Sequence, residues 1–270
     1  MWEKVQETAK FLKEVTNYSP EFGVILGSGL GSFTDDMVIE HTILYADIPN
    51  FPVSTVKGHQ GALVFGKIGN KQVVAMQGRF HYYEGYDMKT VTFPVRVMKY
   101  LGINTMIVSN ASGGVNPNYK VGDVVLIKDH INMFPDHPLR GTNDERFGPR
   151  FVNMSEPYSR ILQKKAKEIA LQHGIDLKEG IYLGLQGPTF ETLAEYKMVK
   201  IVGADCVGMS TVPEVIVARH MELECLGISV ITDMGDEHNI DEVSHEEVLE
   251  AAKKAEPNVR KLIKEFIVSF

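Results

Sequence analysis

The most constraining feature of the sequence is a repeated alternation of short apolar runs with longer segments of helical period. The apolar runs have the length and composition of buried strands and fall at residues 22–26, 61–68, 72–76, 105–109, 124–127, 181–185 and 228–232. Helices are expected at residues 2–15, 88–101, 159–173 and 192–202, within 211–226, and from residue 244. This alternation predicts an α/β fold in which a mixed β-sheet carries helices on both faces, as one domain over residues 1–270.

Length and charge exclude several classes of protein. A chain of 270 residues with 44 % hydrophobic residues can bury a large core. Its formal net charge of -7 argues against binding to nucleic acid or to an anionic membrane surface. No apolar run approaches the roughly 20 residues of a membrane span, and the charged, helical amino terminus does not resemble a signal peptide. Cys206 and Cys225 lie in apolar stretches, which predicts buried free thiols and a cytoplasmic protein.

Three segments contain glycine and serine, and the first two of them follow predicted strands. They are residues 27–31 (GSGLG), 109–114 (SNASGG) and 207–214 (VGMSTVPE). Glycines let backbone N–H groups turn toward an anion, and serines add hydroxyl donors. Ligands of open α/β folds bind at the carboxyl ends of strands, so these segments predict an anion site. Each segment alone could equally be a tight turn, and the last also has the pattern of a helix cap.

Cationic and imidazole side chains accompany these segments. Arg79 and His81 lie two positions apart after the strand at 72–76, so on an extended segment they share a side. A guanidinium fork matches phosphate oxygens, and a neighbouring histidine can add a hydrogen bond. His59 lies between glycines, where a structural hydrogen bond is the alternative interpretation. None of the nine histidines has a metal-ligand spacing and no CxxC occurs, so no metal is expected.

Two adjacent residues, Phe190 and Glu191, could bind a planar ring of a ligand. Phe190 provides a flat face, and Glu191 provides two acceptor oxygens at the start of a helix, where it could also be a simple dipole partner. Asp233 ends a predicted strand and is a candidate acid or base, whereas the acidic loop after it is typical of a solvated surface. Together the segments indicate transfer of a group to or from phosphate on a substrate with a planar ring.

Nine stretches of the chain, in order, resemble the trimeric purine nucleoside phosphorylases of the inosine/guanosine type. They are GSGLGSF, GHQGALVFG, QGRFHYYEGY, TFPVRVMKYLG, SNASGGVNP, GDVVLIKDHINM, PLRGTNDERFGPRF, LQGPTFET and GADCVGMSTVPEVIVARH. The resemblance implies a nucleoside phosphorylase fold with a partly barrel-like sheet. It implies phosphorolysis of purine (deoxy)ribonucleosides, chiefly inosine and guanosine, to free base and (deoxy)ribose 1-phosphate in purine salvage. It also implies a cytoplasmic homotrimer that needs no cofactor, with inorganic phosphate as co-substrate.

The same resemblance assigns roles to matching positions. Phosphate would be held by Ser28, His59, Arg79, His81, the backbone of Ala111, and Ser210. The nucleoside would be held by Tyr83, Phe190, Glu191, Val207, Met209, Asp233 and His245. Phe147 would reach from a neighbouring subunit over the ribose. The catalytic residues would be His59, His81, Glu191 and Asp233.

Asp233 departs from the pattern, because inosine/guanosine enzymes usually carry asparagine there. An ionised carboxylate cannot donate to the purine N7 and would repel a 6-oxo group. Asp233 could be protonated in a dry pocket and donate to N7, or it could accept a hydrogen bond from a 6-amino group. We therefore expect activity on 6-oxopurine nucleosides together with tolerance of adenosine.

Three rival interpretations remain. A methylthioadenosine phosphorylase is favoured by Asp233 and opposed by Glu191 and His245. A noncatalytic purine-binding protein would need no phosphate site. A dinucleotide-dependent oxidoreductase rests on residues 27–31 alone, and Ser32 stands where such a site prefers glycine.

Overall fold

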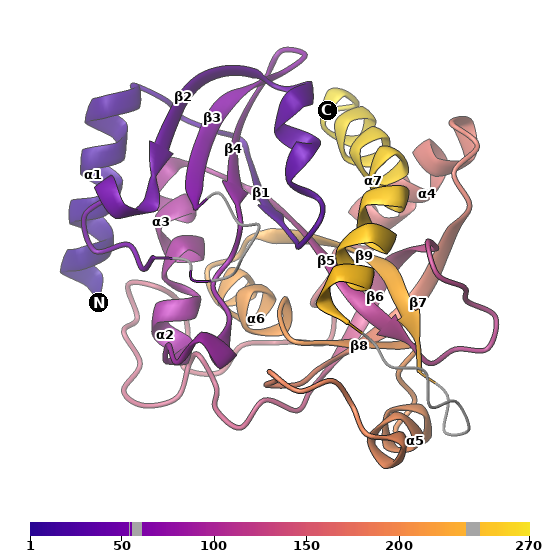
Figure 1. Ribbon diagram of the computed structural model, residues 1–270. Coiled ribbons are helices and arrows are strands. Elements are labelled where there is room, and N and C mark those ends of the chain that lie inside the picture. Colours follow the sequence, from indigo (N-terminus) through magenta and orange to yellow (C-terminus); the bar gives the residue numbers. More distant parts are fainter. Residues whose placement is uncertain (54, 56–60, 236–243) are drawn as a thin grey trace.

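The computed structural model describes residues 1–53, 55, 61–235 and 244–270 (Figure 1). Its strands are β1 (Phe22–Leu26), β2 (Val38–Leu44), β3 (Ala62–Ile68), β4 (Lys71–Gln77), β5 (Thr105–Gly114), β6 (Val124–Asn132), β7 (Leu177–Gly184), β8 (Cys206–Gly208) and β9 (Glu224–Met234). Its α-helices are α1 (Trp2–Thr16), α2 (Met88–Val91), α3 (Phe93–Leu101), α4 (Arg160–Gln172), α5 (Leu193–Ile201), α6 (Val212–His220) and α7 (His245–Val268). Short 3₁₀ turns are η1 (Gly31–Asp36), η2 (Tyr45–Asp47) and η3 (Tyr82–Glu84).

All described strands belong to one mixed sheet, in the order β2-β3-β4-β1-β5-β8-β7-β6-β9. Because β9 also pairs with β5, the strands β5, β8, β7, β6 and β9 close into a ring. Strands β1 to β4 extend from this ring as an open sheet, with β1 parallel to both β4 and β5. The structure thus confirms the predicted mixed, partly barrel-like sheet flanked by helices.

Strand β5 changes its neighbour along one edge. Its first half pairs with β1, from Thr105 to Val108, whereas Gly113 and Gly114 pair with β8. Strand β1 ends at Leu26, and β5 continues beyond this point to pair with β8. Such a change of strand order is where α/β folds form their ligand crevices.

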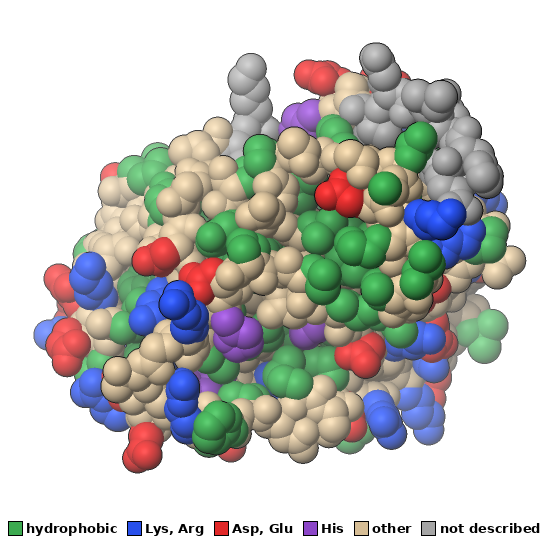
Figure 2. Space-filling view, turned by 90° about the horizontal axis from the view of Figure 1, so that it is seen from below, with side chains coloured by type: hydrophobic (Ala, Val, Ile, Leu, Met, Phe, Trp, Pro, Cys, Tyr) green, Lys and Arg blue, Asp and Glu red, His purple; other side chains and the backbone are tan. Residues whose placement is uncertain are grey.

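Helices cover both faces of the open sheet (Figure 1). Side chains of a strand alternate between faces, and in β1 Ile25 packs with α1, α3 and α6, whereas Val24 and Leu26 pack with α4 and α7. A smaller cluster packs α5 against the end of the ring. No described helix combines the length and the apolar character that a membrane span requires. Figure 2 shows acidic and basic side chains scattered around one face, without a continuous basic surface there.

Several predicted elements are confirmed, and others needed tertiary context. The β3–β4 hairpin turns at Gly69, as predicted. The predicted helix 88–101 is broken at Thr92, because Pro94 stands in the first turn of α3 and Thr92 leaves the helical conformation. Strand β2 was not predicted, because it is a largely exposed edge strand without an apolar face.

The stretch 109–114 is the clearest difference. Its composition predicted a turn after a strand, but it lies inside β5 and is paired with β9 throughout. Strand β9 is likewise longer than predicted, and α6 occupies only part of 211–226. The pairing of β5 with two flanking strands satisfies its backbone, and this outweighs the turn preference of the residues.

Candidate active site

A cavity of about 620 Å³ opens where β5 changes its neighbours. It is lined by the ends of several strands, by the loops that follow them and by the start of α7. The lining includes all sequence-predicted site residues except two: Ser28, Arg79, His81, Tyr83, Ala111, Phe190, Glu191, Val207, Met209, Ser210, Asp233 and His245. The exceptions are His59, which lies outside the described residues, and Phe147.

The first glycine segment packs closely on β5. A Cβ at Gly27 would lie 2.7 Å from the Asn110 Cα and 2.8 Å from the Ser109 carbonyl oxygen, so only glycine fits there. The Gly27 N–H donates to the Ser109 hydroxyl over 3.2 Å. This contact fixes the loop against the strand and keeps Ser28 in the lining of the cavity. The glycine therefore serves close packing as well as access to a ligand.

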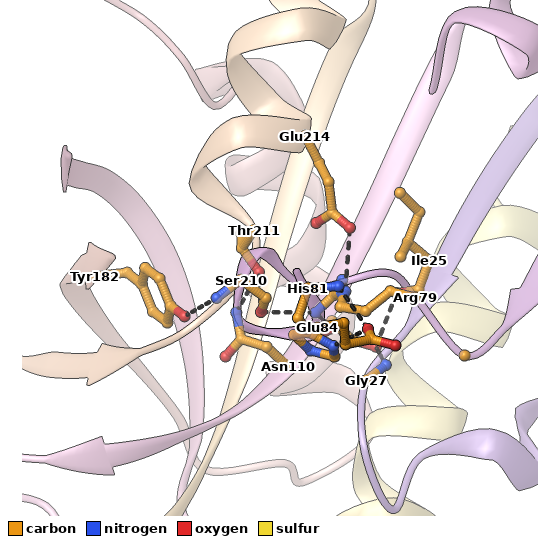
Figure 3. Close-up of polar contacts among 12 residues, drawn as sticks. Ile25, Gly27, Arg79, His81, Glu84, Asn110, Tyr182, Ser210, Thr211 and Glu214 are labelled. Atoms are coloured by element: carbon orange, nitrogen blue, oxygen red, sulfur yellow. Dashed lines mark hydrogen bonds and ion pairs between the residues drawn. The ribbon is translucent and has the colours of Figure 1, made fainter. Parts of the chain in front are cut away.

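Arg79 is 1 % exposed and forms the cationic centre of the cavity (Figure 3). Its Nε donates to Glu214 Oε1 over 3.1 Å, and its Nη1 donates to the Ser109 carbonyl and to Ser210 Oγ over 2.8 and 2.9 Å. Among the described residues, its Nη2 is buried without a hydrogen-bond partner. A buried guanidinium donor without an acceptor is costly, and an oxyanion in the cavity would supply that acceptor.

The backbone next to Arg79 is held in a strained turn. Thr211 has φ 68° and ψ −52°, and the Val212 N–H donates to the Ser210 carbonyl over 2.7 Å. This is a tight γ-turn, which is rare for a residue with a side chain. Asn110 Nδ2 donates to Thr211 Oγ1 over 2.8 Å, and the Ser210 N–H donates to the Tyr182 hydroxyl over 3.3 Å (Figure 3). These bonds place Ser210 directly before the amino terminus of α6, which favours an anion.

His81 is oriented by Glu84, a residue that the sequence interpretation missed. Glu84 Oε1 accepts from the His81 N–H over 2.7 Å and lies 3.2 Å from His81 Nδ1, while Oε2 accepts from Thr55. Burial would raise the pKa of Glu84, but these hydrogen bonds from His81 and Thr55 outweigh it and lower the pKa to about 2. Burial lowers the pKa of His81. The His81 ring stacks on Tyr83 at 4.6 Å between centroids.

Two carboxyl groups lie at the opposite end of the cavity. Burial raises the pKa of Glu191 to about 7, and the charge of Asp233 adds to this rise. Burial also raises the pKa of Asp233, against hydrogen bonds from Thr232 and Tyr196. Thr232 Oγ1 donates to Asp233 Oδ1 over 3.0 Å, and the Tyr196 hydroxyl donates to Oδ2 over 3.5 Å. This end can therefore present either a hydrogen-bond donor or an acceptor near neutral pH.

A β-bulge aims Asp233 into the cavity. In the pairing of β5 with β9, Ser112 faces Ile231 and Gly113 faces Asp233, so Thr232 is an extra residue. A Cβ at Gly113 would lie 2.8 Å from Asp233 Oδ2. The glycine thus leaves room for the carboxyl group, and the bulge re-aims it, as bulges beside sites commonly do.

The middle of the cavity is less polar. Tyr83 and Met209 both lie close to Gly187, where a Cβ would clash with them. Phe190 is 40 % exposed, which leaves part of its ring open to a ligand. His245 is the first residue of α7, after the cap residue Ser244, and also lines the cavity.

Phe147 does not line the 620 Å³ cavity. It is 6 % exposed, packs on Trp2 at 5.4 Å between ring centroids and lies under the Arg96 guanidinium. Phe151, four residues later, is 87 % exposed. The chain thus covers the ring of Phe147 itself and leaves the ring of Phe151 open.

The sequence interpretation also missed residues that position the lining side chains. The spacing of His81 and Glu84 is that of a capping box, which could have found Glu84. Glu214 was taken only as a cap residue, although it is the buried partner of Arg79. Tyr196 carries no signal, because its contact with Asp233 joins α5 to β9. In the described part of the chain no cluster of His, Cys, Asp or Glu is placed to hold a metal ion.

Comparisons with known proteins agree with this geometry. The phosphorylase superfamily model matches residues 21–268. The chain is 49 % identical over 263 residues to purine nucleoside phosphorylase 1 of Geobacillus stearothermophilus, covering 97 % of this chain and 96 % of that protein. The fold also matches two crystal structures, one of a Schistosoma mansoni purine nucleoside phosphorylase with adenosine and one of a Schistosoma purine nucleoside phosphorylase with hypoxanthine. Each aligns with a TM-score of 0.93 at 41 % identity, over 98 % of this chain and 96 % of the other. The chain therefore belongs to the phosphorylase superfamily and, within it, to the purine nucleoside phosphorylases.

Proposed function

We propose that this enzyme cleaves inosine and guanosine with inorganic phosphate and that it also accepts adenosine. The observation that carries the phosphate half of the proposal is the buried Arg79 Nη2, which has no acceptor in the described part of the chain and lies beside Ser210 and the amino terminus of α6. A phosphate dianion would accept from Arg79, Ser210 and Ser28 in this corner. His81, held by Glu84, would add a contact from the neighbouring turn.

The chemistry follows from charge. Breaking the glycosidic bond develops positive charge on the ribose and negative charge on the purine. Phosphate held beside Arg79 would stabilise the ribose cation and then bond to C1′, while groups at the Glu191 end would stabilise the departing base. Tyr83, Met209 and His245 would hold the ribose between these two ends. The reaction gives the free base and (deoxy)ribose 1-phosphate, and phosphate is its co-substrate.

The acceptance of both purine types rests on Glu191. When ionised, its carboxylate accepts from N1–H of hypoxanthine or guanine. When protonated, it donates to N1 of adenine, which carries no hydrogen. A pKa of about 7 makes both forms available near neutral pH. Asp233 would then donate to N7 when protonated, or accept from a 6-amino group when ionised.

The comparisons support this breadth. The Schistosoma enzymes of similar structure are described with adenosine and with hypoxanthine. The similar curated relatives are purine nucleoside phosphorylases, which disfavours the methylthioadenosine phosphorylase alternative.

We also propose a homotrimer in the cytoplasm. Both cysteines are buried free thiols, as expected in a reducing compartment. In a trimer, the aromatic ring that covers a neighbour's ribose would be Phe151 rather than Phe147, since Phe147 is already covered by Trp2 and Arg96.

The experiment that tests the proposed specificity is base release from inosine, guanosine, adenosine and methylthioadenosine at saturating phosphate. The proposal expects activity on the first two, weaker activity on adenosine, and little on methylthioadenosine. Activity confined to the two 6-aminopurine nucleosides would contradict it.

A further inference from the structure

A second cavity of about 80 Å³ lies outside the active site, between α2, α3, the end of α6 and the loop after β6. None of its lining residues also lines the 620 Å³ cavity. Three cationic side chains line it, from Lys89, Arg96 and Arg140, and one carboxylate, from Asp144. It has room for several water molecules or one tetrahedral oxyanion.

Arg96 is the unusual residue of this cavity. It is 6 % exposed, and its Nη1 is buried without a hydrogen-bond partner in the described part of the chain. No ion pair of Arg96 occurs among the described residues; its recorded contact is with the ring of Phe147, 4.4 Å from the guanidinium carbon. Asp144 binds Arg146 instead, at 2.7 and 2.6 Å. A buried charge normally has an ion-pair partner; among the described residues the opposite charge of Asp144 acts on Arg96 but forms no ion pair with it.

His220 lines the same cavity, but it needs a hydrogen-bond donor rather than an acceptor. It is 2 % exposed, and its Nε2 lies 3.1 Å from the Pro149 carbonyl oxygen, which can only accept, so Nε2 carries a hydrogen. Burial, and then the charge of Arg96, lower the pKa of His220, so the ring is neutral. The remaining nitrogen, Nδ1, is therefore an acceptor, and it is buried with no donor from any described residue.

We infer that this second cavity binds a small oxyanion that still carries a proton, of which hydrogen phosphate is the simplest. Its oxygens accept from Arg96, and its P–OH group donates to His220 Nδ1. Lys89 and Arg140 add positive charge around the same cavity. Sulfate has the same shape and meets the need of Arg96, but it has no hydrogen for His220. Water meets both needs in hydrogen bonds but supplies no ion-pair partner for Arg96.

The test compares the wild-type enzyme with Arg96→Met, which keeps an apolar side chain over Phe147. Calorimetric titration with inorganic phosphate should show two sites per chain in the wild type and one in Arg96→Met. Lys99→Met, on the same helix but outside the cavity, should keep both sites. Without phosphate, Arg96→Met should be at least as stable to heat as the wild type, because it removes a buried charge that has no partner.

A second variant keeps the inference falsifiable if Arg96→Met folds poorly. His220→Phe removes both ring nitrogens and with them the acceptor, so the second site should no longer prefer hydrogen phosphate over sulfate. A single phosphate site in the wild type, or equal thermal stabilisation of wild type and Arg96→Met by phosphate, would overturn the inference. Inosine cleavage by Arg96→Met is measured in parallel, so loss of the second site remains distinct from failure of the proposed function.

Discussion

Arg79 Nε donates to Glu214 Oε1 over 3.1 Å, although the two residues lie 135 positions apart and both are buried. The pair joins the end of β4 to the first turn of α6. It balances the charge of Arg79 and fixes the direction of the guanidinium, whose Nη2 remains available to a phosphate oxygen. The guanidinium group that would bind phosphate is thus positioned by a carboxylate that lies outside the lining of the cavity.

Replacing Glu214 should therefore weaken both the fold and phosphate binding. Glu214→Ala leaves a buried guanidinium without its partner, so the free energy of unfolding should fall by about 3–5 kcal/mol. The KM for phosphate should rise by at least about tenfold, more than the KM for inosine. Glu224→Ala is the matched control, because Glu224 is itself exposed and its ion pair with Arg219 should contribute about 0–1 kcal/mol. Equal effects of the two variants would contradict the positioning role.

The choice of base should depend on pH. Ionisation of Glu191 favours inosine and its protonation favours adenosine, and burial raises its pKa to about 7. The ratio of kcat/KM for inosine to that for adenosine should therefore rise by at least about tenfold between pH 6 and 8. Using the ratio removes the titration of phosphate itself, which affects both substrates equally. Glu191→Gln should flatten the ratio, and a wild-type ratio that does not change with pH would exclude Glu191 from contact with N1.

Asp233→Asn should sharpen the preference for 6-oxopurines. Asparagine donates to N7 at every pH, and its neutral amide oxygen is a weaker acceptor for a 6-amino group than a carboxylate. We expect the inosine-to-adenosine ratio of kcat/KM to increase by about tenfold, which corresponds to one hydrogen bond of about 1.4 kcal/mol. The measurement is steady-state kinetics on both nucleosides at pH 7. An unchanged ratio would show that Asp233 does not select the base.

Replacing Phe147 should lower the stability of the protein, whereas replacing Phe151 should affect its activity. Phe147→Ala removes a buried ring from the Trp2 and Arg96 contacts and should cost about 3–5 kcal/mol in the free energy of unfolding. Phe151→Ala changes an exposed ring, so the free energy of unfolding should change by less than about 0.5 kcal/mol. If Phe151 covers the ribose of a neighbouring subunit, its loss should raise the KM for inosine. Chemical denaturation and kinetics on both variants decide this, and the reverse pattern would return the role to Phe147.

The sequence predicted those parts of the fold that depend on local pattern. Apolar runs located β1, β3, β4 and the core of β6, because these strands are buried along most of their length. Pattern could not locate β2, an exposed edge, or β8, which has three residues. It also could not show that residues 109–114 are strand, since their pairing with β9 is decided by segments far along the chain.

The sequence predicted most of the residues that line the cavity, but not the residues that position them. Glycine and serine segments and the family resemblance led to residues such as Ser28 and Ser210, which the fold brings into one cavity. Their roles stay predictions. Tyr196 and the bulge at Thr232 have no local signal, because each matters only through a contact between distant elements. Phe147 was chosen from a motif, and only the packing separates it from the exposed Phe151.

The central claim is that phosphate is the second substrate and captures the ribose. Incubation of the enzyme with inosine and inorganic phosphate should release hypoxanthine and ribose 1-phosphate in equal amounts, and omission of phosphate should stop release. Quantifying both products with and without phosphate therefore tests the account directly. Release of hypoxanthine with free ribose in the absence of phosphate would identify a hydrolase and contradict it.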